Sequence, residues 1–112
     1  MPDLQRRLVS FRDARDWAQF HNAKDLAAAI AIEAGELQEL FLWKNSEEVD
    51  GVLRDRREDV ECELADVLIR TLNFAATTGI DVLDALERKI KVNEMRYPVE
   101  KARGSSAKHT EL

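Results

Sequence analysis

Hydrophobic residues recur along this chain with the spacing of helical faces, and no segment alternates in the way of a β-strand. Residues suited to capping precede these segments, with Asn22 and Asp25 both eligible before the second one. Gly79 follows the third at a position suited to the left-handed conformation. Four main helices are expected, over about residues 4–20, 22–44, 56–77 and 82–95. The pattern therefore predicts an all-α fold, a four-helix bundle.

Shorter features lie between and after these helices. Ser46, followed by two glutamates, has the character of another helix start, which Gly51 would loosen. Pro98 ends the last helix, and residues from about 97 to 112 are expected to form an extended tail. Because the chain shows no internal repeat, residues 1–112 are expected to form a single domain of ordinary size.

The second predicted helix carries a carboxylate where a hydrophobic side chain is expected. Its apolar stripe consists of Leu26, Ile30, Leu37 and Phe41. Glu33 falls in the middle of this stripe, and Glu36 lies to one side of it. A carboxylate that faces a core is costly unless it is paired, protonated or bound to a metal. Glu33 is therefore unlike an ordinary solvated glutamate.

The third predicted helix is apolar around most of its circumference, as a buried helix should be. Its polar exceptions repeat at steps of three, four and three, and they are Glu63, Asp66, Arg70 and Asn73. This spacing places them on one narrow stripe. The stripe is either the solvent edge of a packed helix or one wall of a site.

The relative spacing of these two helices favours a site. In an antiparallel helical pair, residues that share a level have position numbers with the same sum. Glu33 with Asp66 and Glu36 with Glu63 meet this condition, if the chain turns beside Gly51. Four carboxylates at one level repel one another and are typical ligands of hard cations such as Mg²⁺ or Mn²⁺. No histidine falls in this cluster, which disfavours zinc.

The amino-acid composition limits the binding partners and oligomeric states that are expected. The 22 acidic and 17 basic residues give a net charge of −5, which argues against a nucleic-acid polymer as ligand. Since 45% of the 112 residues are hydrophobic, a large share for so small a chain, a homodimer or homotetramer is expected. The single cysteine, Cys62, is expected in the core. No membrane span or secretory signal is visible, and the expected location is the cytoplasm.

Further sequence features make the acidic pattern specific. The words around it are RDWAQFH at 15–21, GELQELFLWK at 35–44, ELADVLI at 63–69, RYPVE at 96–100 and RGSSAKHTEL at 103–112. Together with the motifs ExxE at 33–36 and ExxD at 63–66, they cover the chain from about Phe11 to its last residue. In these features the sequence resembles the MazG-like all-α nucleotide pyrophosphohydrolases, and most closely their dCTP pyrophosphatase branch.

The resemblance implies a Mg²⁺-dependent enzyme that hydrolyses (deoxy)nucleoside triphosphates, with a dCTP-like nucleotide as substrate, to monophosphate and pyrophosphate. The implied metal ligands are Glu33, Glu36, Glu63 and Asp66, with Mn²⁺ as an alternative cation. A bound metal would lower the pKa of a water that attacks the α-phosphorus. Glu36 is the candidate catalytic residue that relays the proton, and Glu39 is a second choice.

Substrate contacts are implied at two places. Trp17 and Trp43 match tryptophans that enclose the nucleobase in this branch, where indole faces stack on a base. Two core tryptophans are the structural alternative. Phosphate contacts are implied for polar residues of the C-terminal segment, namely Lys89, Asn93, Arg96 and Lys108. For Arg96, a charge that merely favours a helix C-terminus is the alternative.

The sequence departs from the branch at three positions. Arg70 stands where the branch usually has tyrosine, Leu8 stands where it has a base-contacting histidine, and His109 replaces a tyrosine near the end. Because Arg70 shares a stripe with Glu63 and Asp66, we expect it to face the site. It would pair with a carboxylate there or contact the nucleotide. The reaction is expected to be kept, and the preferred base is left open.

Two functions from other classes stay open at this point. One is a regulatory helical module that binds metal or nucleotide without turnover, and the other is a structural oligomer with an acidic seam. Magnesium-dependent release of pyrophosphate separates an enzyme from both. Stabilisation by metal separates the module from the structural oligomer.

Overall fold

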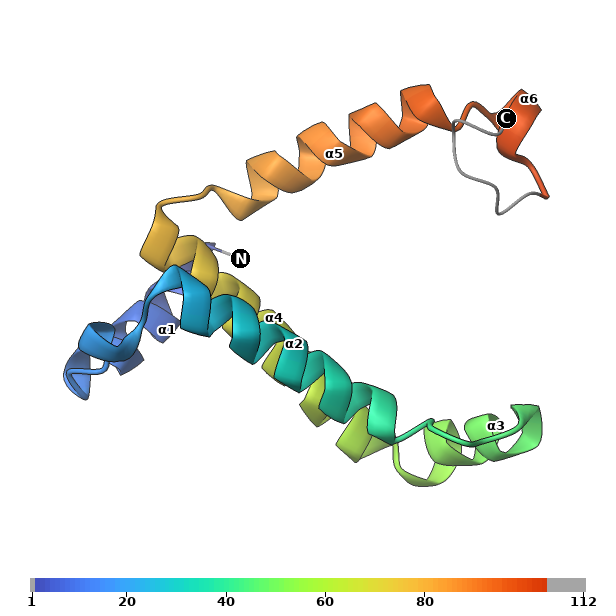
Figure 1. The fold of residues 1–112 in the computed structure, drawn as a ribbon, viewed down its shortest axis with the longest axis horizontal. Helices are drawn as coiled ribbons and strands as arrows, with labels where there is room; N and C mark the ends of the chain where they lie inside the picture. The colour runs from blue at the N-terminus through green and yellow to red at the C-terminus, as the bar shows by residue number, and fades with distance from the viewer. Residues whose placement is uncertain (1, 105–112) are drawn as a thin grey trace. The chain divides into compact units, whose positions relative to one another are not determined.

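The computed structural model describes residues 2–104, and these residues form helices joined by turns, with no strand among them (Figure 1). The elements are α1 (Pro2–Ala14), the 3₁₀ helix η1 (Ala18–Phe20), α2 (Ala23–Glu39), α3 (Ser46–Asp55), α4 (Arg57–Thr78), α5 (Val82–Arg96) and α6 (Val99–Ala102). The predicted all-α class is confirmed. None of the described helices is both long and apolar enough to cross a membrane.

The chain divides into two compact units, Met1–Ile80 and Asp81–Leu112. Within the N-terminal unit, α2 lies antiparallel along α4, and this is the most extensive helix contact (Figure 1). The helices α1 and α3 also pack against α4. The C-terminal unit contains α5 and α6. The single domain expected over residues 1–112 stays a prediction.

Side-chain caps fix where several helices begin. The N–H of Asp25 donates to Oδ1 of Asn22 at 2.9 Å, so Asn22 is the cap of α2. Asn45 and Glu48 form a reciprocal capping box at the start of α3. Asp81 caps α5, as its position in the sequence indicates. Capping hydrogen bonds between residues close in the sequence therefore define where these helices begin.

The helix α1 is shorter than expected, because Asp16 adopts a left-handed conformation with φ of 55°. The N–H of Asp16 donates to the carbonyl of Asp13 at 3.1 Å, and the N–H of Trp17 donates to that of Arg12 at 2.9 Å. These two bonds form a Schellman motif, which closes a helix and redirects the chain. The expectation that this helix reaches residue 20 is therefore wrong.

The helix α2 is also shorter than expected, since it ends at Glu39 rather than near residue 44. The following turn contains Trp43 at φ of 62°, a conformation that bulky residues rarely adopt. A helix cannot continue through a residue of positive φ. This turn leads directly into the capping box of α3.

The predicted extended tail is wrong in one part. Residues Val99–Ala102 form one helical turn, α6, directly after Pro98. Proline has a fixed φ and lacks an N–H, so it is well suited to stand before a first helical turn. Residues 105–112 of that predicted tail lie outside the described part of the chain.

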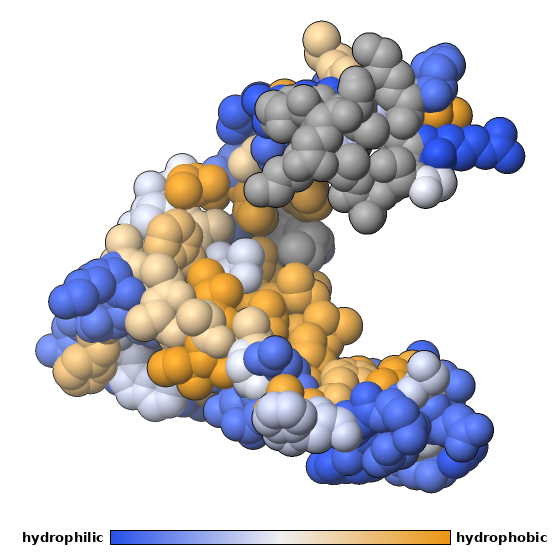
Figure 2. Space-filling model, turned by 45° about the vertical axis from the view of Figure 1, so that its right-hand side comes forward, coloured by the Kyte–Doolittle hydropathy of each residue, from blue (hydrophilic) through white to orange (hydrophobic). Residues whose placement is uncertain are grey.

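Few side chains are buried. The buried hydrophobic residues of the described chain are Leu26, Val52, Leu72 and Ala75. On α4, Leu64 and Leu68 are each 49% exposed. Hydrophobic side chains reach the surface over much of the N-terminal unit (Figure 2). Cys62 is exposed as well, so its expected place in the core is wrong.

The end of α4 yields a stability prediction. Gly79 has φ of 74°, and the space around its Cβ position is open to 4 Å, so alanine there meets backbone strain alone. We expect Gly79→Ala to lower the free energy of unfolding by about 1 kcal/mol. Gly51→Ala, inside α3, should instead raise it by about 0.5 kcal/mol. Urea unfolding followed by circular dichroism measures both free energies. Equal stability of the two variants would contradict the left-handed conformation of Gly79 and the helical conformation of Gly51.

Candidate functional site

Four carboxylates meet between α2 and α4. Glu33 and Glu36 come from α2, whereas Glu63 and Asp66 come from α4. One oxygen of each lies within 4.8 Å of those of the others. The antiparallel packing brings the two i, i+3 pairs to one level. The predicted juxtaposition of the acids is therefore confirmed, and their role as metal ligands stays a prediction. We call this group the acidic cluster.

The acidic cluster contains oxygen atoms that lack partners. The Oε2 atoms of Glu33 and Glu63 are buried and form no hydrogen bond. The Glu33 side chain is only 12% exposed, so water does not readily compensate it. Leaving a buried carboxylate oxygen unpaired is costly. Since all four donors are carboxylates, the cluster fits a hard divalent cation that would satisfy these atoms.

The neighbouring carboxylates of the cluster change the pKa of Glu36. Its pKa is raised from the ordinary value, first because the protonated carboxyl can hydrogen-bond to Glu33. The negative charges of Glu33 and Glu63 raise the pKa further, because they disfavour a further ionised carboxyl beside them. The acids thus repel one another, as the sequence led us to expect.

Among the described residues, one basic side chain forms an ion pair with the cluster. Arg70 Nε donates to Oε1 of Glu33 at 3.3 Å, in an ion pair that joins α4 to α2. The Arg70 side chain is 41% exposed. Of the two alternatives left by the sequence, pairing with a carboxylate is therefore observed. Contact of Arg70 with a nucleotide stays a prediction.

A pocket of about 310 Å³ opens beside the cluster. It combines aromatic, polar and acidic side chains, and its lining is Leu8, Phe11, Arg12, Trp17, His21, Glu33, Asp66, Ile69, Arg70 and Asn73. The rings of Trp17 and Phe11 stand edge to face, with centroids 5.7 Å apart, and the Arg15 guanidinium lies 3.6 Å from the Phe11 centroid. These contacts hold Trp17 in the wall. We call this the Trp17 pocket.

His21 is a site residue that the sequence analysis missed. It lines the Trp17 pocket and also a neighbouring pocket of about 260 Å³. Its Nδ1 is buried without a hydrogen bond. Burial lowers its pKa, and the positive charges of Arg12 and Arg70 lower it further. A neutral imidazole with an open nitrogen can bond a ligand. The sequence feature that could have identified it is its place four residues after Trp17 in the RDWAQFH segment.

Trp43 does not line the Trp17 pocket. It lies in the turn after α2 and is 92% exposed. The structure thus brings Trp17, but not Trp43, to the acidic cluster within one chain. A core position, the structural alternative for both tryptophans, is wrong, because Trp17 is also 46% exposed.

The predicted phosphate contacts lie in the C-terminal unit. Lys89, Asn93 and Arg96 are exposed on α5, and Arg96 lies in its last turn. Lys108 and His109 fall outside the described residues. A role for these residues in binding substrate stays a prediction.

Comparisons with known proteins identify the family of this chain. Residues 28–112, which include the four acids, match the MazG-like family. The chain is 40% identical over 114 residues to dCTP pyrophosphatase 1 of Bos taurus, covering all of this chain and 68% of that protein. The human protein of that name is also 40% identical, with 67% covered.

A solved structure is similar as well. The crystal structure of a pyrophosphatase from Archaeoglobus fulgidus superimposes with a TM-score of 0.83 at 42% sequence identity. The match covers 88% of this chain and 92% of that one. Sequence and fold therefore point to one family, as the motifs predicted. The chain belongs to the MazG-like family.

Proposed function

We propose that this protein is a metal-dependent pyrophosphohydrolase that converts (deoxy)nucleoside triphosphates to monophosphates and pyrophosphate. The observation that carries the proposal is the acidic cluster, whose carboxylate oxygens lie within 4.8 Å of one another beside an aromatic pocket. Relatives named as pyrophosphatases support the reaction type. Their similarity to this chain makes enzymatic activity the function that is best supported for this site.

Mg²⁺ is the proposed cofactor, with Mn²⁺ as an alternative of the same oxygen preference. The residues that would hold it are Glu33, Glu36, Glu63 and Asp66. When bound, such a cation neutralises phosphate charge and lowers the pKa of a coordinated water. The buried, unpartnered oxygens of Glu33 and Glu63 support this assignment.

Glu36 is the proposed proton acceptor for the water that attacks the α-phosphorus. It is the exposed member of the cluster, so it can exchange its proton with solvent. Glu39 is exposed and stands outside the cluster, which makes it the weaker candidate. Pyrophosphate is the leaving group.

The proposed substrate is a cytidine-like deoxynucleoside triphosphate, because the named relatives are dCTP pyrophosphatases. Trp17 supplies an aromatic wall for the base, and Trp43 is a further proposed base contact. Leu8 and Arg70, two of the three departures from the branch, both line the Trp17 pocket. The choice among bases is therefore proposed to differ from that of a strict dCTP enzyme. Phosphate contacts are proposed for Lys89, Asn93, Arg96 and Lys108.

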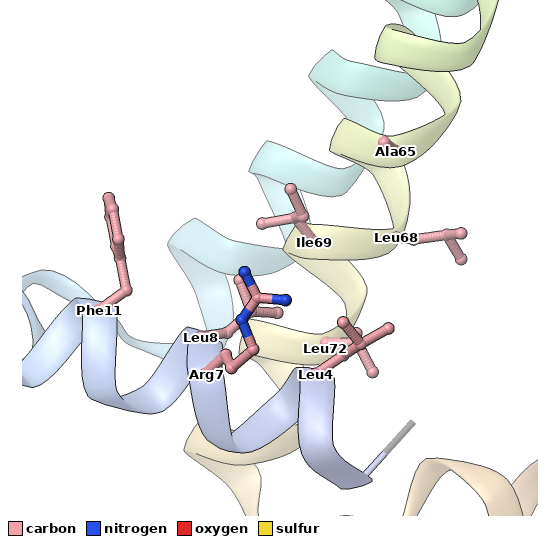
Figure 3. Close-up of a pocket in the computed structure, with 8 residues that line it drawn as sticks. All are labelled: Leu4, Arg7, Leu8, Phe11, Ala65, Leu68, Ile69 and Leu72. Atoms are coloured by element: carbon pink, nitrogen blue, oxygen red, sulfur yellow. The ribbon is translucent and has the colours of Figure 1, made fainter.

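We also propose that the chain assembles as a homodimer or homotetramer. The helices α1 and α4 leave an apolar groove of about 430 Å³ between them (Figure 3). Its lining is Leu4, Arg7, Leu8, Phe11, Ala65, Leu68, Ile69 and Leu72. A contiguous exposed apolar surface of this kind is typical of an interaction surface. A second copy covers it with matching apolar side chains.

The metal assignment predicts the behaviour of two variants. Glu33→Gln or Asp66→Asn should reduce pyrophosphate release by about a hundredfold or more, because each removes a proposed ligand. Circular dichroism should show helix content near wild type. Glu58→Gln, at an exposed position of α4 outside the cluster, is the control and should stay active. Retention of about half the activity by either site variant would overturn the ligand assignment.

The same assay separates the enzyme from the regulatory module. Purified wild-type protein is screened with common and modified nucleoside triphosphates in Mg²⁺. Stabilisation by Mg²⁺ without release of pyrophosphate from any nucleotide would favour the module.

The base pocket predicts a change in selectivity. A guanidinium offers only hydrogen-bond donors, whereas a phenol both donates and accepts. Arg70→Tyr should therefore alter the ranking of the bases by kcat/KM. Trp43→Ala should raise KM for every substrate, since stacking does not depend on the base. Arg57→Tyr, at the exposed start of α4, is the control. If Arg70→Tyr changes neither the ranking nor KM, Arg70 is only an ion-pair partner.

The exposed apolar groove predicts assembly. Light scattering at micromolar concentration should give a mass of two or four times the chain mass of 12.8 kDa. Leu68→Asp places a charge in the groove and should shift the protein toward smaller species. A stable monomer in the wild type would contradict the proposal.

A further inference from the structure

Arg70 and a divalent cation have the same carboxylate within reach. Arg70 Nε bonds Oε1 of Glu33 at 3.3 Å, and Glu33 belongs to the acidic cluster. We propose that Arg70 competes with the cation for Glu33, and thereby weakens metal binding and sets the metal concentration that the protein requires. This inference rests on the proposed function, because it takes the four acids as the metal ligands.

Glu33 is the least exposed carboxylate among the ion pairs of the described residues. Its side chain is 12% exposed, whereas both partners of the Arg57–Glu61 pair on α4 are largely exposed. Charges in water are screened, and exposed pairs contribute little. A mostly buried carboxylate is screened less, so the charge of Arg70 is felt more strongly there. Among the described residues, Arg70 forms the ion pair that reaches the cluster.

Two opposite effects of Arg70 on the metal are distinguishable by sign. If Arg70 only orients Glu33, leaving Oε2 free for the cation, its removal loosens a ligand and weakens metal binding. If Arg70 competes, its removal frees Oε1 and takes a positive charge away from the cation, and metal binding strengthens. The second effect is expected to dominate. Repulsion among four carboxylates is already large, and Arg70 is the basic group of the described residues that pairs with one of them.

The test measures Mn²⁺ binding to the full chain, by electron paramagnetic resonance or calorimetry, without nucleotide. We expect Arg70→Gln to bind Mn²⁺ about three- to tenfold more tightly than wild type, a range reduced by the partial exposure of Arg70. Arg70→Lys keeps the charge and should lie close to wild type. Arg57→Gln removes one positive charge from the same helix outside the site, and its affinity should stay within about twofold of wild type.

Stability without metal gives a second readout. In the presence of a chelator, Arg70→Gln should lower Tm, because Glu33 loses its partner within the cluster. The same substitution in a Glu33→Gln background should have little effect on Tm. This double-mutant comparison isolates the Arg70–Glu33 interaction from general effects of the substitution.

The outcomes separate the inference from the proposed function. Equal or weaker Mn²⁺ binding by Arg70→Gln would overturn the competition, as would the absence of Mn²⁺ binding from both proteins. Tighter binding by Arg70→Gln supports it, even if no nucleotide is hydrolysed. Failure of hydrolysis with intact Mn²⁺ binding would reject the proposed reaction and leave the competition standing.

Discussion

The antiparallel packing of α2 on α4 is the constraint on which the site depends. Each helix carries two acids at i and i+3, and the observed register of the pair places one oxygen of each of the four within 4.8 Å of the others. A slip of one residue turns a side chain by about 100° around its helix and would separate the oxygens. The capping box that starts α3 and the contact of α3 with α4 help to fix this register. The chemistry of the site is thus a consequence of how two helices meet.

This packing works against the charges that it assembles. Leu26 of α2 and Leu72 of α4 are buried and contribute favourably to folding, whereas the four carboxylates repel one another. The Arg70–Glu33 pair relieves part of that repulsion, and the raised pKa of Glu36 is one of its consequences. A site of this kind lowers the stability of the protein for the sake of binding, which is a common compromise in enzymes. A bound cation would turn this unfavourable term into a favourable one.

The sequence predicted the site better than it predicted the helix ends. The common level of Glu33 with Asp66 followed from helical geometry and from the assumption that the two helices pack antiparallel. The turn assumed beside Gly51 is wrong, because Gly51 lies inside α3 and this helix makes the connection. The ends of α1 and α2 depend on positive φ at Asp16 and Trp43, where no glycine announces a turn. His21 was missed because it lies outside the acidic cluster, and only the fold shows that it lines the adjacent pockets.

The small core connects the proposed base pocket to the proposed assembly surface. Leu8, Phe11 and Ile69 line both the Trp17 pocket and the apolar groove between α1 and α4. Phe11 also holds the Trp17 ring by an edge-to-face contact. Anything that packs into the groove therefore touches side chains that shape the proposed base pocket. Since α1 meets the rest of its unit chiefly through α4, covering the groove also restrains the wall that carries Trp17. The burial of the apolar groove and the geometry of the proposed base pocket therefore depend on the same side chains.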